Sequence, residues 1–397
     1  MSDELTDNPK PMKQKRNKQI FLYCSICLIL LVVFLSYWFI VLRCSEYTND
    51  AYVEGNMVYI TPLRQGFITK IHTDDTFLVK KGQVLIDLDT TDSEINLHRS
   101  QEELAKAVRE VCQSFHQVFI YQTEIDISQA ELVRATQDYQ HRQDVIKRGG
   151  VTIEDMEHAA AALEVNISAL KKAKSLYEQA LSIVQNTSIK SHPKVLAAAD
   201  WVREAFVQLK RCRIYAPVEG LVAQRKAQVG MWVNPSKPIM SVIPLDQIWV
   251  NANYKETQLK HIRIGQKVKL TSDLYGSDII YHGTIVGLPG AAGDAFSLLP
   301  PQNLTGNWIK IVQRVPVRIA IDANDLQKHP LRIGLSMEST VTISRDEGGL
   351  VPTTTNAPSY ETSVYETEEV GVDELIHAII NANLDPKLEY YANHPLF

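Results

Sequence analysis

The chain has 397 residues, 45% apolar and 22% charged, an ordinary composition for a protein with a buried core. Its net charge of −5 gives no reason to expect a nucleic-acid partner, and five scattered cysteines argue against a disulfide-stapled fold. The charge is uneven, because positions 346–397 carry ten acidic residues and one lysine. The acidity therefore belongs to a tail, and the rest of the chain is slightly basic.

An uncharged stretch of 23 residues, Ile20–Leu42, is long enough to cross a bilayer as a single helix. It is longer than the apolar region of a signal peptide and lacks a small-residue cleavage site. Five basic residues precede it, whereas only Arg43 closely follows it. The positive-inside rule predicts that residues 1–19 are cytoplasmic and that the bulk of the chain lies across the membrane. Because one span cannot enclose a transport path, a role in transport would require a partner.

A heptad repeat of apolar residues runs through residues 93–211 and predicts a coiled coil. Its two arms, 93–148 and 153–211, have 56 and 59 residues and predict an antiparallel hairpin. Two glycines mark the turn, a threonine followed by an aspartate predicts a helix N-cap, and Pro193 predicts a kink or short loop. The first arm's seam is Leu97, Leu104, Val111, Val118, Ile125, Leu132, Tyr139 and Ile146. The second arm's two seams are Met156, Leu163, Leu170, Tyr177 and Val184, and Ile153, Ala160, Ile167, Lys174 and Leu181.

Two similar β segments flank the hairpin, within residues 47–92 and 212–245. Each alternates apolar and polar residues between Gly and Pro, as strands do. The positions that align are Gly66 with Gly220, Ile60 with Ile214, Val79 with Val233, and Leu85 with Ile239. We therefore predict that the two halves close into one flattened β-domain with the hairpin inserted between them.

Residues 246–345 read as short strands of a small barrel, to which the segment 46–59 adds further strands. The tail, 346–397, is predicted to be mostly disordered because it is rich in Pro, Thr and Glu. Val372–Leu384 could form a short amphipathic helix, either partner-binding or marginal. The predicted fold class is mixed α+β and elongated: a transmembrane helix, a split lipoyl-like β-domain with an inserted coiled-coil hairpin, and a β-barrel.

The two β halves resemble the biotinyl/lipoyl carrier fold. True carriers keep a modified lysine at the turn between the halves, where this chain reads Asp89-Thr90-Thr91-Asp92. A carrier subunit of an enzyme is therefore a disfavoured alternative, and no cofactor is expected. No P-loop, H-E-x-x-H or G-x-S-x-G motif occurs, so the chain is not predicted to be an enzyme.

The order of lipoyl-like half, hairpin and lipoyl-like half resembles the HlyD family of membrane fusion proteins, the periplasmic adaptors of Gram-negative export systems. Thr48–Val53, Trp249–Gln258 and a block from Ala295 to Arg318 resemble the EmrA-type branch. The signature residues in that block are Phe296, Leu299, Pro300, Asn303, Gly306, Asn307, Trp308, Gln313 and Arg314.

This resemblance implies an inner-membrane adaptor of a tripartite multidrug efflux pump. Its expected partners are a major-facilitator exporter, a TolC-like outer-membrane channel, and copies of itself as a trimer or hexamer. An adaptor for an ABC-type protein secretion system is the first alternative, and a coiled-coil scaffold without a transport role is another.

In the wider family, the hairpin tip docks to the channel through an arginine, a leucine and a serine. With Thr152 in the serine place, the leucine place holds Val145 and the arginine place holds His141, next to Arg142. A purely structural interpretation also stays open: Thr152 as an N-cap, Val145 as packing and Arg142 as a solvated charge. The candidate docking residues are Arg142, Val145, Gly149, Gly150 and Thr152.

Overall fold

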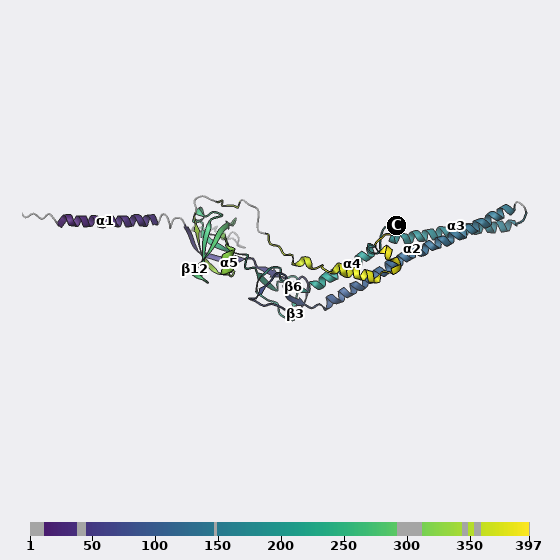
Figure 1. The fold of residues 1–397 in the computed structure, drawn as a ribbon, viewed down its shortest axis with the longest axis horizontal. Helices are drawn as coiled ribbons and strands as arrows, with labels where there is room; N and C mark the ends of the chain where they lie inside the picture. The colour runs from purple at the N-terminus through teal and green to yellow at the C-terminus, as the bar shows by residue number, and fades with distance from the viewer. Residues whose placement is uncertain are drawn as a thin grey trace, which may run out of the picture.

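The computed structural model describes residues 12–37, 45–146, 149–291, 312–343, 348–352 and 359–396. A single helix, a β-barrel, a β-sandwich and a helical hairpin follow one another along an elongated molecule (Figure 1). Helix α1 (Met12–Tyr37) contains the apolar stretch Ile20–Tyr37, which is long enough to cross a membrane and is not covered by other parts of the chain. The predicted end of the span at Leu42 lies outside the described residues.

Six antiparallel strands close into a barrel in the order β1-β10-β13-β12-β11-β14. Residues alternate between the interior and the surface, and Val250, Ala252 and Tyr254 of one strand are fully buried. The strands are β1 (Ser45–Gly55), β10 (Ile248–Lys255), β11 (Lys267–Ser272), β12 (Gly276–Gly287), β13 (Arg314–Ile321) and β14 (Ser336–Thr342), and a short helix, α5 (Ala323–Lys328), follows β13. Because β1 begins eight residues after α1, the barrel is the domain nearest the membrane helix.

The lipoyl-like domain is a sandwich of two four-stranded sheets, β2-β9-β7-β4 and β6-β5-β3-β8. The first half supplies β2 (Val58–Ile60), β3 (Gly66–Ile71), β4 (Leu78–Val79) and β5 (Val84–Leu88); the second supplies β6 (Arg213–Tyr215), β7 (Gly220–Ala223), β8 (Trp232–Val233) and β9 (Met240–Ile243). Exchanging each strand for its counterpart converts one sheet order into the other, which confirms the predicted repeat. Each sheet takes two strands from each half, so neither half can form a complete sheet alone.

The hairpin consists of α2 (Thr91–Ile146), α3 (Ile153–Val184) and α4 (Pro193–Lys210). The predicted seam of the first arm is buried or half-buried throughout, and so is the Met156 seam of the second. The other predicted seam is wrong at Ile153 and Ile167, which are 72% and 51% exposed, whereas its Leu181 packs against the core. Small residues one position earlier in the heptad, Ala159, Ala173 and Ala180, are buried instead and allow the arms to approach closely.

The second arm is interrupted between α3 and α4, as Pro193 predicted. Pro193 is the first residue of α4, where its missing N–H costs nothing, and the His192 side chain caps the helix by accepting from the Lys194 N–H at 3.2 Å. Ile189, within the interruption, is fully buried. The break at 185–192 is therefore an ordered joint that depends on apolar cover.

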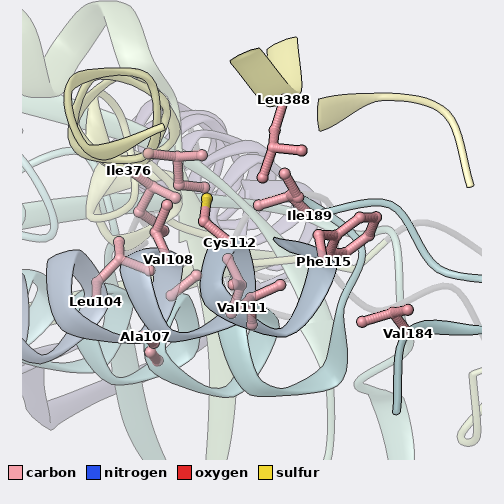
Figure 2. Packing of buried hydrophobic residues seen from close by; sticks show 14 of the residues in the cluster. Leu104, Ala107, Val108, Val111, Cys112, Phe115, Val184, Ile189, Ile376 and Leu388 are labelled. Carbon is pink, nitrogen blue, oxygen red and sulfur yellow. The ribbon is translucent and has the colours of Figure 1, made fainter. Parts of the chain in front are cut away.

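The prediction of a mostly disordered tail is wrong for residues 359–396, which we call the strap. The strap contains α6 (Val372–Asn383) and two 3-10 helices, η4 (Val364–Thr367) and η5 (Pro386–Ala392), and it lies along α2 and α4 (Figure 1). Figure 2 shows Ile376 above Val108 and Cys112, and Leu388 beside Ile189. The strap is ordered because its apolar residues complete the core of the hairpin base, an effect that composition does not reveal.

Polar contacts fix the strap along its length, from the sandwich to the joint. They are Thr362 to the Pro217 carbonyl (2.7 Å), Glu368 to Arg211 (2.9 Å), Asp373 to Arg203 (2.6 Å), Asp385 to His116 (2.8 Å), and the Tyr391 and Ala392 carbonyls to the Ile189 and Lys190 N–H groups (3.0 and 3.3 Å). The backbone of the joint thus donates its hydrogen bonds to the strap. The strap therefore pairs with the backbone of the chain between α3 and α4, where helical hydrogen bonds are missing.

We predict that Ile376→Ala loosens the strap, because truncating a buried isoleucine typically costs about 2–5 kcal/mol. Hydrogen exchange in the full-length chain in detergent should then show faster exchange of the Ile189 and Lys190 amides. Ile127→Ala, at an exposed position on α2, is the matched control and should leave those amides protected. Unchanged exchange in Ile376→Ala would contradict a bracing role for the strap.

Candidate docking sites

The hairpin tip is a short turn between Ile146, the last residue of α2, and Ile153, the first residue of α3. Gly149 has a φ of 72°, in the left-handed region that favours glycine. A Cβ at Gly150 would lie 2.7 Å from Val145 Cγ1, so a larger residue there would push against Val145. Both glycines therefore serve the turn itself, which is what their predicted place between the arms requires.

Thr152 caps α3 through a reciprocal pair of hydrogen bonds. Its hydroxyl accepts from the Asp155 N–H at 3.1 Å, and the Asp155 carboxylate accepts from the Thr152 N–H at 3.4 Å. Hydrogen bonds from the Thr152 side chain and backbone hold the pKa of Asp155 below its usual value. The predicted N-cap is confirmed, and it occupies the hydroxyl that a docking role would otherwise use.

Arg142 joins the two arms of the tip. Its guanidinium donates to the Asp155 carbonyl at 3.0 Å and to the Asp138 carboxylate at 3.2 Å. The interpretation of Arg142 as a merely solvated charge is therefore wrong. Its contacts hold the end of α2 against the start of α3.

The apolar side chains that the tip leaves free are Val145, 40% exposed, and Ile153, 72% exposed. Both flank the glycine turn, at the end of α2 and the start of α3. Sequence reasoning missed Ile153 because it fitted the heptad row of the second arm. Its place directly after an N-cap residue was the available signal, since a first-turn side chain at a hairpin end has no opposing arm to cover it.

A second polar site lies on the barrel, and we call it the rim network. Its centre is Asp50, whose carboxylate contacts Arg314 at 2.9 Å and accepts from the Asn253 amide at 3.0 Å. Thr48 donates to the Asn253 carbonyl at 2.9 Å, and the Gln258 amide donates to Glu46 at 2.9 Å. These residues come from β1, β10, β13 and the turn after β10.

The rim network unites residues from the three segments that carry the family resemblance. Because Glu46, Thr48 and Asp50 are near the start of β1, the network lies where the chain arrives from α1. The Gln313 carbonyl accepts from the Glu256 N–H at 3.0 Å at the same edge. The other signature residues lie outside the described residues: Phe296, Leu299, Pro300, Asn303, Gly306, Asn307 and Trp308.

Within the described ranges, no group of three His, Cys, Asp or Glu residues is placed to hold a metal ion. The polar groups of both sites instead bond to one another and fix the shape of a surface. Both sites are suited to contact other macromolecules.

Comparison with known proteins places these features in context. Residues 91–212 match the family model described as the EMRA alpha-helical hairpin domain, and residues 247–344 match the AAEA-like beta-barrel domain. The solved structure of the periplasmic adaptor protein EmrA aligns with 76% of this chain and 99% of its own, at 17% identity and a TM-score of 0.39.

Two relatives from Escherichia coli (strain K12) match much more of the sequence. The probable multidrug resistance protein EmrK is 38% identical over 389 residues, which cover 96% of this chain and 99% of that protein. The multidrug export protein EmrA is 40% identical over 352 residues, which cover 87% of this chain and 89% of that protein. The similarity therefore extends over nearly the whole chain rather than over a single domain.

We predict that Thr152→Ala frays the start of α3, because losing such a cap costs about 0.5–2 kcal/mol. Hydrogen exchange of the peptide covering residues 151–160 should accelerate, after correction for intrinsic rates. Thr123→Ala, an exposed helix-interior site on α2, is the matched control. If exchange at the tip stays unchanged, the cap does not stabilise the tip.

The same cap should weaken in acid. Because the folded-state pKa of Asp155 is lowered, its stabilisation is present above the unfolded pKa of about 3.9 and is lost as pH falls through the folded value. The corrected exchange rate at residues 151–160 should therefore rise below about pH 4. Asp155→Asn should remove that pH dependence; a dependence that persisted in this variant would assign it to another group.

Proposed function

Because the chain belongs to the EmrA-type family of membrane fusion proteins, we propose that it is the periplasmic adaptor of a tripartite multidrug efflux pump. The observation that carries this proposal is the position of its two contact sites. The rim network lies beside the membrane helix, and the exposed tip lies at the far end of a hairpin with a 56-residue first helix. Such a helix extends about 80 Å. The chain is anchored in the inner membrane, and its bulk is periplasmic.

At the inner membrane, we propose that α1 and the rim network contact a major-facilitator exporter. An exporter embedded in the bilayer can reach only the span and the domain next to it, which is the barrel. The side chains of Asp50 and Arg314 are 28% and 43% exposed while bonded to each other. They can therefore give a partner fixed polar groups without first being ordered.

At the other end, we propose that the tip contacts a TolC-like outer-membrane channel. Val145 and Ile153 are exposed apolar side chains near helix ends that Arg142 holds together, and covering apolar side chains with a partner is favourable. Arg142, Gly149, Gly150 and Thr152 then act by shaping the turn. This division of roles separates residues that make the contact from residues that position it.

Self-assembly as a trimer or hexamer completes the proposal. The sandwich ends in two-residue edge strands, β4 and β8, which expose Leu78 and Trp232. Exposed apolar edge strands favour cover by another chain. The pseudo-two-fold relation between the halves places one such edge on each sheet.

The alternatives have weaker support. In place of a carrier lysine, the chain has Asp89–Asp92, and α2 already begins at Thr91. Both Escherichia coli relatives are named for multidrug export or resistance rather than for protein secretion. We therefore propose drug-like xenobiotics as the exported compounds.

We predict that a photo-crosslinking amino acid at Val145 or Ile153 yields an adduct with an outer-membrane channel in intact cells. Gln122, an exposed position in the middle of the same arm, is the control and should give no such adduct. Equal labelling along the arm would contradict docking by the tip.

Deleting the gene should also increase sensitivity to hydrophobic toxicants, and the wild-type gene should restore resistance. A gene with Val145→Asp and Ile153→Asp should not restore it, because burying unpaired carboxylates at the contact is costly. Unchanged drug sensitivity in the deletion strain would contradict the proposed export function.

A further inference from the structure

An open groove runs between α2 and α4 at the base of the hairpin. Its volume is about 790 Å³, and its lining combines small alanines, an indole and arginines. Trp201, on α4, is 69% exposed. The residues that matter here are Ala107, Ala198, Ala205, Trp201, Arg64 and Arg99. No residue of the strap lines this groove.

The groove and the strap lie on opposite flanks of the α2–α4 pair. On α4, Lys194, Trp201 and Gln208 line the groove at seven-residue spacing. Arg203 bonds to the strap and is two residues, or about 200° of helix, from Trp201. On α2, Ser100 and Ala107 line the groove, and the strap bonds instead to residues on another face, at positions 109 and 116. One flank of the pair is therefore covered and the other is open.

The outer surface of the strap is an acidic ridge with an apolar residue at its centre. Val370 is 68% exposed, and Glu366, Glu369 and Glu374 beside it are exposed. Neither lysine nor arginine occurs between positions 359 and 386. Apart from Glu368 and Asp373, which bond to the hairpin, the carboxylates of the ridge have no cation partner among the described residues.

The groove carries the opposite charge. Its Lys194 is paired with Glu110 and its Glu103 with Lys106. The other charged residues of the lining are Arg64, which donates to the Gln208 carbonyl at 3.4 Å, Arg99, and the single acid Glu204. The local excess is therefore positive. An apolar hollow beside arginines complements an apolar knob beside glutamates.

The ridge and the groove also lie at the same height on the hairpin. The strap's Glu368 and Asp373 bond to Arg211 and Arg203, so the ridge runs beside the stretch of α4 that holds Trp201 and Gln208. Rotation about an axis parallel to the hairpin keeps every residue at its height. In a ring of side-by-side copies, the ridge of one copy therefore arrives level with the groove of the next.

We propose that the groove between α2 and α4 receives residues 366–374 of a second copy of this chain. Val370 fills the hollow against Trp201 and the alanines, Glu369 faces Arg64, and Glu374 faces Arg99. The inference rests on the proposed function in one respect, which is that adaptor copies assemble side by side around a common axis. The strap thus braces its own hairpin with one face and holds the neighbouring copy with the other.

Photo-crosslinking from position 201 tests this contact in the full-length, membrane-embedded chain. A photo-crosslinking residue in place of Trp201 should join to a peptide within residues 359–374. Co-expression of two differently tagged forms of the chain should give hybrid adducts, which prove that two copies are joined. Leu196, exposed on another face of α4, is the control position and should not label that peptide. Adducts within one copy only, with another stretch of the chain, or with a different protein would overturn the proposal.

A charge exchange provides the second measurement. Arg99→Glu should lower the hybrid yield by about tenfold, equivalent to roughly 1.4 kcal/mol, because it faces the ridge with a like charge. Adding Glu374→Arg to the same chain should restore the yield, since each copy then supplies both changed faces and Arg64 keeps its glutamate. Protection of the Ile189 amide checks that each variant keeps its strap docked. Failure of the exchange to restore the yield in a docked chain would overturn the charge pairing.

The tip experiment separates this inference from the proposed function. If Val145 still forms its channel adduct while position 201 gives no hybrid adduct, the adaptor function is supported and the proposed strap contact is contradicted. If both adducts are absent, the proposed function itself fails.

Discussion

The pairing of β5 with β6 is the constraint on which the rest of the molecule depends. α2 follows β5 and α4 precedes β6, so the two ends of the hairpin start from neighbouring strands of one sheet. The Leu88 N–H donates to the Cys212 carbonyl at 2.8 Å and extends this pairing up to the helices. Because each sheet mixes strands from both halves, the sandwich cannot form until the whole hairpin has closed. The direction of the hairpin is therefore set by sheet geometry and not by a flexible linker.

A hairpin anchored at one end is only as stiff as its weakest point, which is the joint at 185–192. There the second arm lacks continuous helical hydrogen bonds, and the apolar cover of Ile189 comes from the strap. The strap also bonds to the sandwich at Pro217. It thus connects the anchor, the base and the joint, and its removal would free the distal part of the hairpin to bend. A tip contact far from the membrane depends on that stiffness.

The features that sequence predicted are those that local periodicity encodes. The heptads, the glycine turn, the cap at Thr152 and the helix start at Pro193 each depend on residues within a few turns, and the strand repeat is visible as spacing. The helix at Val372–Leu384 was predicted and is α6, but the docking of the strap was missed because it depends on a surface built from residues distant in the sequence. Arg314 was predicted as a signature residue, but the contacts of the rim network were missed for the same reason. Asp50, Asn253 and Arg314 have ordinary neighbours, and only barrel closure brings them together.

In the proposed adaptor, insertion in one membrane limits how copies can meet. All copies have the same span direction, so any symmetry axis that relates them is perpendicular to the bilayer. The groove and the ridge are on opposite flanks. A contact of groove with groove, or of ridge with ridge, would therefore leave the other surface of each copy exposed. A contact of ridge into groove uses each surface once per copy and propagates in one sense around the axis, which is how head-to-tail contacts close into rings. The strap therefore gives the hairpin two unlike sides. In a ring assembled through them, every copy offers its ridge to the next copy in the same rotational direction.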